Sequence, residues 1–257
     1  MTDMTSDRGN GGDRMDTRRI NWAEFIERAG LVFLLIGVIV LFSILRPNTF
    51  ATYANFRSIT TAQPVMAVAA LALIVPLVGG RFDVSVGAIL GLCAIACASA
   101  MSHFGLPLAV AVVIGIGMGA FIGLINGFIV AYLGVNSIIG TLGVATILGG
   151  VVTGYTKGIS SGLSPVLTDI SIQTIAGLPL LLILMAIIAV ITWFVLTQTP
   201  YGRNLTAVGA NAESARLTGI RTKRVVMSSF VLSGVLAGAA GVLQIGSQGN
   251  AGPQLVG

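Results

Sequence analysis

Seven runs of apolar residues, almost free of charge, divide the chain and limit what it can fold into. A bilayer core about 30 Å thick needs roughly 20 mostly apolar residues for each spanning helix. The runs lie at about 29–45, 59–79, 84–101, 106–133, 138–153, 177–197 and 225–245. Only 9% of the 257 residues are charged, whereas soluble domains carry roughly 25%. The sequence therefore predicts an all-α polytopic membrane protein with about seven transmembrane helices in a lipid bilayer.

The N-terminal residues differ from the apolar runs. Residues 1–20 are polar and mix arginines with aspartates, so they predict a disordered cytoplasmic tail and not a cleavable signal peptide. Residues 21–28 place Trp22, Phe25 and Ile26 on one helical face, which predicts a short interfacial helix before the first span. Residues 29–257 form the predicted transmembrane domain, and its loop-like ending suggests that the chain is cut short.

The positions of Lys and Arg predict the orientation, because cytoplasmic loops retain positive charge. With the N-terminus inside, the cytoplasmic segments hold Arg8, Arg14, Arg18, Arg19, Arg28, Arg81, Arg203, Arg216, Arg221, Lys223 and Arg224. The outside segments hold only Arg46, Arg57 and Lys157. We therefore expect a cytoplasmic N-terminus. Since these charges adjoin apolar spans and have little aromatic interleaving, they do not indicate a nucleic-acid partner.

The sequence indicates no catalytic residue, metal site or cofactor site. Cys93 and Cys97 lie four residues apart in one apolar run, and His103 is the only histidine, so no ligand set with metal-site spacing exists. We interpret both cysteines as packing residues. The chain contains no Gly-Lys-Ser or Gly-Lys-Thr of a phosphate-binding loop, so we expect neither ATP binding nor enzyme activity.

A ridge of glycines marks the run at 106–133. Gly115, Gly119, Gly123 and Gly127 recur every four residues, which allows another helix to approach closely. Packing within the chain is the favoured interpretation, and a seam between two copies is the alternative.

Asp83 is the only acidic residue between Glu27 and Asp169. It precedes an apolar run, so its carboxylate is in place to cap the free amides of the next helix. Capping is the favoured interpretation. The alternative is a role in gating or in a solute path, shared with Ser85 and Asn126. No span has an acid at its centre, which disfavours a carrier driven by protons or other ions.

A long polar stretch, residues 198–224, separates the last two runs. In it, Asn211 is a good N-cap, Glu213 follows in the first turn, and Gly219 can end a helix in the left-handed conformation. The stretch thus predicts a short surface helix. On physical grounds alone, a docking element for a soluble partner and a solvated loop are equally favoured.

Several motifs resemble those of the ribose/xylose-type sugar permeases of bacterial ATP-binding-cassette importers, over about residues 30–245. The matching residues are Gly202-Arg203, Ala207-Val208-Gly209, Asn211, Ala215-Arg216, Gly219-Ile220, Asp83-Val84-Ser85-Val86-Gly87, Asn126-Gly127 and Thr141-Leu142-Gly143. Ser214 stands where alanine is commoner, and Arg81-Phe82 stands where glycine-isoleucine is usual. Members of this family have about ten spans, so roughly three are expected to be missing from this chain.

The resemblance implies a permease subunit that translocates a small polar solute, such as a monosaccharide, across the bacterial inner membrane. It implies that a separate ATPase subunit docks on the polar stretch at Arg203, Gly209, Asn211, Glu213, Arg216 and Gly219. It also implies a periplasmic or lipoprotein solute-binding protein and a second permease copy. A permease for branched-chain amino acids and an ion-coupled secondary transporter are the alternatives, and a non-transporting membrane scaffold is the least favoured.

Overall fold

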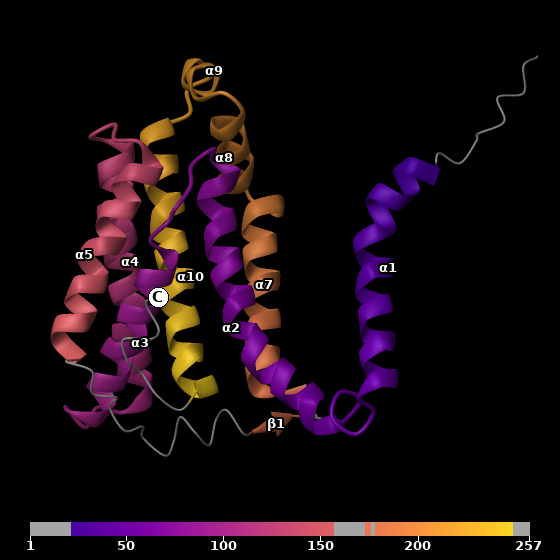
Figure 1. Ribbon diagram of the computed structural model, residues 1–257. Helices are drawn as coiled ribbons and strands as arrows, with labels where there is room; N and C mark the ends of the chain where they lie inside the picture. The colour runs from indigo at the N-terminus through magenta and orange to yellow at the C-terminus, as the bar shows by residue number, and fades with distance from the viewer. Residues whose placement is uncertain (1–21, 157–172, 176–177, 249–257) are drawn as a thin grey trace, which may run out of the picture. The chain divides into compact units, whose positions relative to one another are not determined.

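The structure, a computed structural model, describes residues 22–156, 173–175 and 178–248 (Figure 1). The predicted tail lies outside these residues. The elements are α1 (Trp22–Leu45), α2 (Tyr53–Val78), α3 (Val86–Ser102), α4 (Leu108–Ala131), α5 (Ser137–Thr156), β1 (Thr174–Ile175), β2 (Leu178–Pro179), α7 (Leu180–Gln198), α8 (Pro200–Ala210), α9 (Ala212–Leu217) and α10 (Thr222–Gln248). The strands β1 and β2 form a small antiparallel pair in which Thr174 faces Pro179.

Each of the seven predicted spans is a helix, namely α1, α2, α3, α4, α5, α7 and α10. Within the described residues, five helices are long and apolar enough to cross a membrane: α2, α4, α5, α7 and α10. The apolar part of α1, Gly30–Leu45, and α3 are shorter. The prediction of an all-α polytopic membrane fold is confirmed.

The chain divides into two compact units, residues 1–55 and 56–257. In the first unit, α1 runs without a break from Trp22 to Leu45. The described residues of the predicted interfacial helix, 22–28, are therefore continuous with the first span. After α1, the ring of Phe50 packs against that of Phe42, with 5.6 Å between the ring centroids.

In the second unit, α3 contacts α4, α5 and α10. Its sequence is rich in small residues, and most of them are buried. Cys93 and Cys97 are free and fully buried in this helix, which confirms that they pack.

The glycine ridge of α4 lies against α10. A Cβ atom added to Gly119 or Gly123 would overlap the backbone of α10, at the carbonyl oxygens of Gly234 and Phe230. One added to Gly127 would lie 2.8 Å from the carbonyl oxygen of Met227. The backbone of α4 comes this close to α10 because the ridge residues of α4 carry no side chains. The interpretation that the ridge packs within the chain is confirmed.

The same end of the second unit collects α8, α9, the last turns of α2 and the first turns of α10 (Figure 1). The turn between α4 and α5 belongs to this end as well, since the amine of Lys223 lies 5.6 Å from the ring centroid of Tyr132. The candidate site extends from this end into the helix bundle.

Candidate functional site

The polar stretch between α7 and α10 folds into two short helices. Asn211 caps α9, because its Oδ1 accepts a hydrogen bond from the amide of Ser214 at 2.9 Å. Gly219, with φ of +88°, ends the turn that follows, a conformation that glycine adopts without strain. The predicted surface helix is confirmed. The sequence prediction missed α8, although Thr199 at the N-cap and Pro200 at the first helical position are start signals.

One face of α9 is open to the surroundings. Glu213 and Arg216 form an ion pair at 2.6 Å, with 69% and 66% of their side chains exposed. The carboxylate of Glu213 accepts a hydrogen bond from Arg216 and raises the pKa of its guanidinium. Leu217 is 78% exposed, whereas Ala215 on the other face is buried in a cluster with Val226 and Phe230 of α10. The helix is thus held on one side and presents two charges and a leucine on the other.

The helix α8 is fixed to the bundle by its apolar residues and by a glycine contact. Leu205 and Val208 are buried. A Cβ atom added to Gly209 would overlap the carbonyl oxygen of Val78, the last residue of α2. On the other side of this contact, Gly80 has φ of +71°, and a Cβ atom there would lie 3.2 Å from the carbonyl oxygen of Gly209. Only glycines allow the two backbones to meet in this way.

The segment 79–85 connects α2 to α3, and we call it the α2–α3 loop. Its Asp83 side chain is fully buried and accepts three hydrogen bonds. Oδ1 accepts from the amide of Ser85 at 3.0 Å and from its Oγ at 2.6 Å, and Oδ2 accepts from Oγ of Ser233 in α10 at 3.1 Å. The Oγ of Ser85 in turn accepts from Nδ2 of Asn126 in α4 at 2.7 Å.

The structure therefore brings together Asp83, Ser85 and Asn126, the three residues singled out from the sequence for a role in gating or a solute path. All are buried. It adds Ser233, which the sequence prediction missed because a serine inside an apolar run carries no signal of its own. We call these four residues the Asp83 network.

The prediction that Asp83 caps the free amides of α3 is wrong. The residue at the N-cap of α3 is Ser85, and its side chain makes no capping bond. Asp83 accepts the amide of that N-cap residue, while its other oxygen is turned toward α10. The carboxylate therefore joins the loop to a distant helix instead of completing the first turn of α3.

Two side chains of α5 hold the backbone of the same loop. The amide of Phe82 donates to Oγ of Ser137 at 3.2 Å, and the amide of Val84 donates to Oγ1 of Thr141 at 3.0 Å. The donors to Asp83 are the amide and hydroxyl of Ser85 and the hydroxyl of Ser233. Among the described residues, the carboxylate of Asp83 is thus hydrogen-bonded to hydroxyl and amide donors and to no basic side chain.

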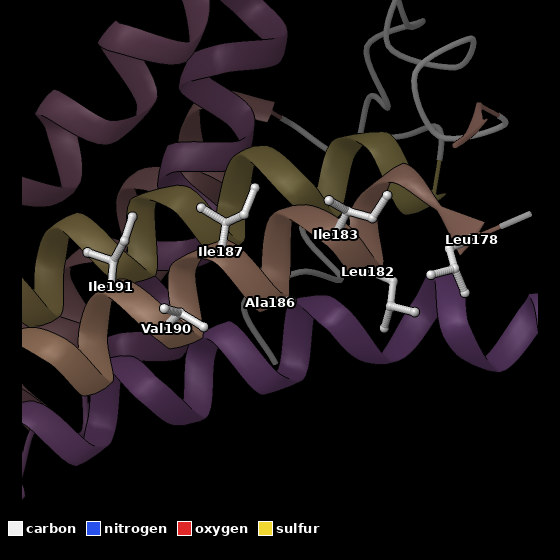
Figure 2. A pocket seen from close by; sticks show the side chains of 7 residues that line it. All are labelled: Leu178, Leu182, Ile183, Ala186, Ile187, Val190 and Ile191. Carbon is white, nitrogen blue, oxygen red and sulfur yellow. The ribbon is translucent and has the colours of Figure 1, made fainter. Parts of the chain in front are cut away.

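Two pockets lie elsewhere in the described residues, and both are apolar. One of about 470 Å³ lies among α3, α4 and α5 and includes Ser99 and Tyr155. The other, of about 440 Å³, is a groove along α7 (Figure 2). Its lining is aliphatic throughout: Leu178, Leu182, Ile183, Ala186, Ile187, Val190 and Ile191. Neither pocket includes a residue of the Asp83 network, and an aliphatic groove offers no hydrogen bonds to a polar solute.

The described residues contain no group of three or more His, Cys, Asp or Glu side chains that could hold a metal ion. The chemistry available at this end of the bundle is therefore that of hydrogen bonds, close backbone contacts and one exposed ion pair.

Comparison with known proteins identifies the family. Residues 55–257 match the family described as branched-chain amino acid transport system / permease component. The D-allose transport system permease protein AlsC of Escherichia coli K12 is 31% identical over 239 residues, which cover 93% of this chain and 73% of the relative. The autoinducer 2 import system permease protein LsrD of Photorhabdus laumondii is 32% identical over 231 residues, covering 86% of this chain and 68% of the relative.

A second LsrD, from Yersinia enterocolitica, is 30% identical over 244 residues, covering 91% of this chain and 71% of the relative. No solved structure matches the chain. The family match covers α2 to α10, and with them the Asp83 network, α8 and α9. The chain therefore belongs to the family of permease components of branched-chain amino acid transport systems, which includes permeases of sugar-type import systems.

Proposed function

We propose that this chain is the membrane-spanning permease subunit of an ATP-driven importer and that its solute is a small polar molecule of the sugar class. The names of AlsC and LsrD, which refer to D-allose and autoinducer 2, support this solute class. Branched-chain amino acids are the second candidate, because the family description names them.

The charges support a cytoplasmic location for the end that carries α8 and α9. Among the described residues of the second unit, this end holds Arg81, Arg203, Arg216, Arg221, Lys223 and Arg224. The opposite end holds Arg57, in the first turns of α2. Cytoplasmic segments retain positive charge. Since α1 and α2 each cross the membrane in this proposal, the N-terminus is cytoplasmic too.

The observation that carries the proposal is the exposed face of α9. A six-residue helix does not form stably alone in water, yet α9 is capped at Asn211 and packed against α10 through Ala215. Its other face leaves Glu213, Arg216 and Leu217 free to contact a second protein. We propose that this face, with α8 behind it, docks on the ATPase subunit. The solute-binding protein meets the opposite end, and a second permease copy completes the translocation path.

The composition of the spanning helices favours an ATP-driven importer over an ion-coupled carrier. The helices α2, α3, α4, α5, α7 and α10 contain no Asp or Glu. Ion-driven carriers keep ionisable residues within the membrane to bind the driving ion. Asp83, which lies between two of these helices, is buried and fully hydrogen-bonded.

Reconstitution tests the proposal. The chain is placed in vesicles with an ATPase subunit and a solute-binding protein of the same import system, and uptake of labelled D-allose and of labelled leucine is measured together with ATP hydrolysis. We expect uptake of the sugar that requires ATP. Replacing Gly209 and Glu213 together by alanine should uncouple hydrolysis from uptake. The control is Gly143→Ala in α5, where an added Cβ meets open space.

Unchanged coupling in the double variant would count against docking at α8 and α9. Uptake that follows an imposed sodium or proton gradient without ATP would contradict the importer assignment, and uptake of leucine alone would favour the amino-acid alternative.

A further inference from the structure

The α2–α3 loop makes two kinds of contact within a few residues. At Gly80 its backbone touches Gly209, the penultimate residue of α8. Three residues later, Asp83 bonds to Ser233 in the middle part of α10. The loop therefore lies directly between the docking helices and the interior of the bundle.

We propose that Asp83 is a positioning residue that transmits displacement of α8 to the spanning helices α4, α5 and α10. This rests on the proposed function, in which α8 and α9 dock on the ATPase. In this proposal Asp83, which is fully buried, acts through the loop that it holds and not by contact with solute or ATPase.

Burial makes the attachment of the loop strong. Asp83, Ser85, Asn126 and Ser233 have at most 1% of their surface exposed. A carboxylate shielded from water loses stability when one of its hydrogen-bond donors is removed, and hydrogen bonds to charged groups are worth more than neutral ones. The loop cannot move away from α10 without leaving an oxygen of Asp83 unpaired. A displacement of the loop therefore has to carry α10 with it or change the network.

The loop is also attached to two other helices. Ser85 links it to Asn126 of α4, and Thr141 of α5 accepts the amide of Val84. The helices α4, α5 and α10 are thus all hydrogen-bonded to the α2–α3 loop. A purely local role at the start of α3 would need the bond to Ser85 but not the bond to a residue 150 positions away.

The network contains an acceptor that permits a second arrangement. Oδ1 of Asn126 is buried and accepts no hydrogen bond from the described residues. In the proposed second arrangement, a hydroxyl released from Asp83 bonds to this oxygen, so the hydroxyl stays paired while Asp83 gives up one donor. Two discrete arrangements of a packed polar network are what coupling between distant sites requires.

The first test uses the purified full chain in lipid nanodiscs and measures hydrogen exchange of backbone amides. Ser233→Ala removes only the bond to α10. We expect amides of α8, residues 200–210, to exchange about tenfold faster, which is the size of effect that loss of one hydrogen bond to a charged group produces. The control is Ser229→Ala in the same helix, because Ser229 is buried and bonds to the carbonyl of Val226 in its own helix.

Faster exchange confined to residues 79–86 and to the surroundings of residue 233 would show a merely local role and overturn the proposal. Asp83→Asn provides a second variant of nearly the same shape, in which the charge is lost. It should also speed exchange in α8, and unchanged exchange there would contradict the proposal even if Ser233→Ala failed to fold.

The second test uses the reconstituted importer and separates this inference from the proposed function. Ser233→Ala should lower the amount of solute taken up per ATP hydrolysed about tenfold, while the ATPase still copurifies with the chain. Full coupling in this variant would overturn the role of Asp83. If the unaltered chain takes up no solute with ATP, the proposed function fails, and the hydrogen-exchange result still decides whether Asp83 connects α8 to α10.

Discussion

Oδ2 of Asp83 accepts a hydrogen bond from Oγ of Ser233 at 3.1 Å, although 150 residues separate them in the chain. This bond joins the connection between α2 and α3 to α10. Because Gly80 of the same loop touches Gly209 of α8, a surface helix and the bundle interior meet on one short segment.

The contact between α8 and α2 predicts that Gly209→Ala destabilises the protein. The added methyl group overlaps the carbonyl oxygen of Val78, and overpacking of this kind costs about 1 to 3 kcal/mol. Thermal unfolding in detergent measures it, with Gly143→Ala as the control. Equal melting temperatures for the two variants would show that α8 does not press against α2.

The glycine ridge predicts an asymmetry within α4. Gly123→Ala places a methyl group on the carbonyl oxygen of Phe230, whereas a Cβ at Gly117 meets nothing within 4 Å. The first variant should lower the free energy of unfolding by about 1 to 3 kcal/mol. The second should leave it unchanged or raise it slightly, since alanine favours helix. Similar effects of both substitutions would contradict the packing of α4 on α10.

The N-cap of α9 predicts that replacing Asn211 by alanine weakens the first turn of this helix. Asn211→Ala deletes the acceptor for the amide of Ser214, and loss of an N-cap costs about 1 kcal/mol. Hydrogen exchange at Ser214 should become faster, and Asn211→Ser should restore protection because serine also caps. Protection that survives in the alanine variant would mean that packing through Ala215 alone holds the helix.

The exposed ion pair predicts that a substitution at Glu213 weakens docking on the ATPase without lowering the stability of the protein. Glu213 and Arg216 are both largely exposed, so Glu213→Gln should leave the melting temperature unchanged, since such pairs contribute little to stability. The same variant should reduce copurification of the ATPase. Because exposed charges are screened, the difference between the variant and the unaltered chain should shrink at high salt. A lower melting temperature with intact copurification would point to a structural role instead.

Much of the fold could be predicted from the sequence, because the bilayer fixes the length and apolarity of each spanning helix. The runs at 106–133 and 225–245 became α4 and α10 with ends shifted by only a few residues. The helix that begins after Asn211 could be predicted equally well, since its N-cap and its terminal glycine are local signals. The helix α8 was missed even though Thr199 and Pro200 carry the same kind of signal.

The partners in the site could not be predicted, because they depend on tertiary contacts. The isolation of Asp83 in the sequence indicated that it matters, but nothing near it pointed to Ser233. The capping interpretation used only local geometry, whereas the carboxylate bonds to Ser85 through one oxygen and to Ser233 of α10 through the other. Likewise, the spacing of Gly115, Gly119, Gly123 and Gly127 predicted a close helix contact without naming the helix.

Docking of α9 on a cytoplasmic ATPase requires that α9 face the cytoplasmic side of the membrane. Single cysteines are placed at Arg216 in α9 and at Tyr155, which is exposed near the end of α5 opposite to α9, in a background with Cys93→Ala and Cys97→Ala. Intact spheroplasts are then treated with a membrane-impermeant maleimide. We predict labelling at position 155 in intact spheroplasts and labelling at position 216 only after permeabilisation. Labelling at position 216 in intact spheroplasts would contradict docking on a cytoplasmic ATPase and with it the importer assignment.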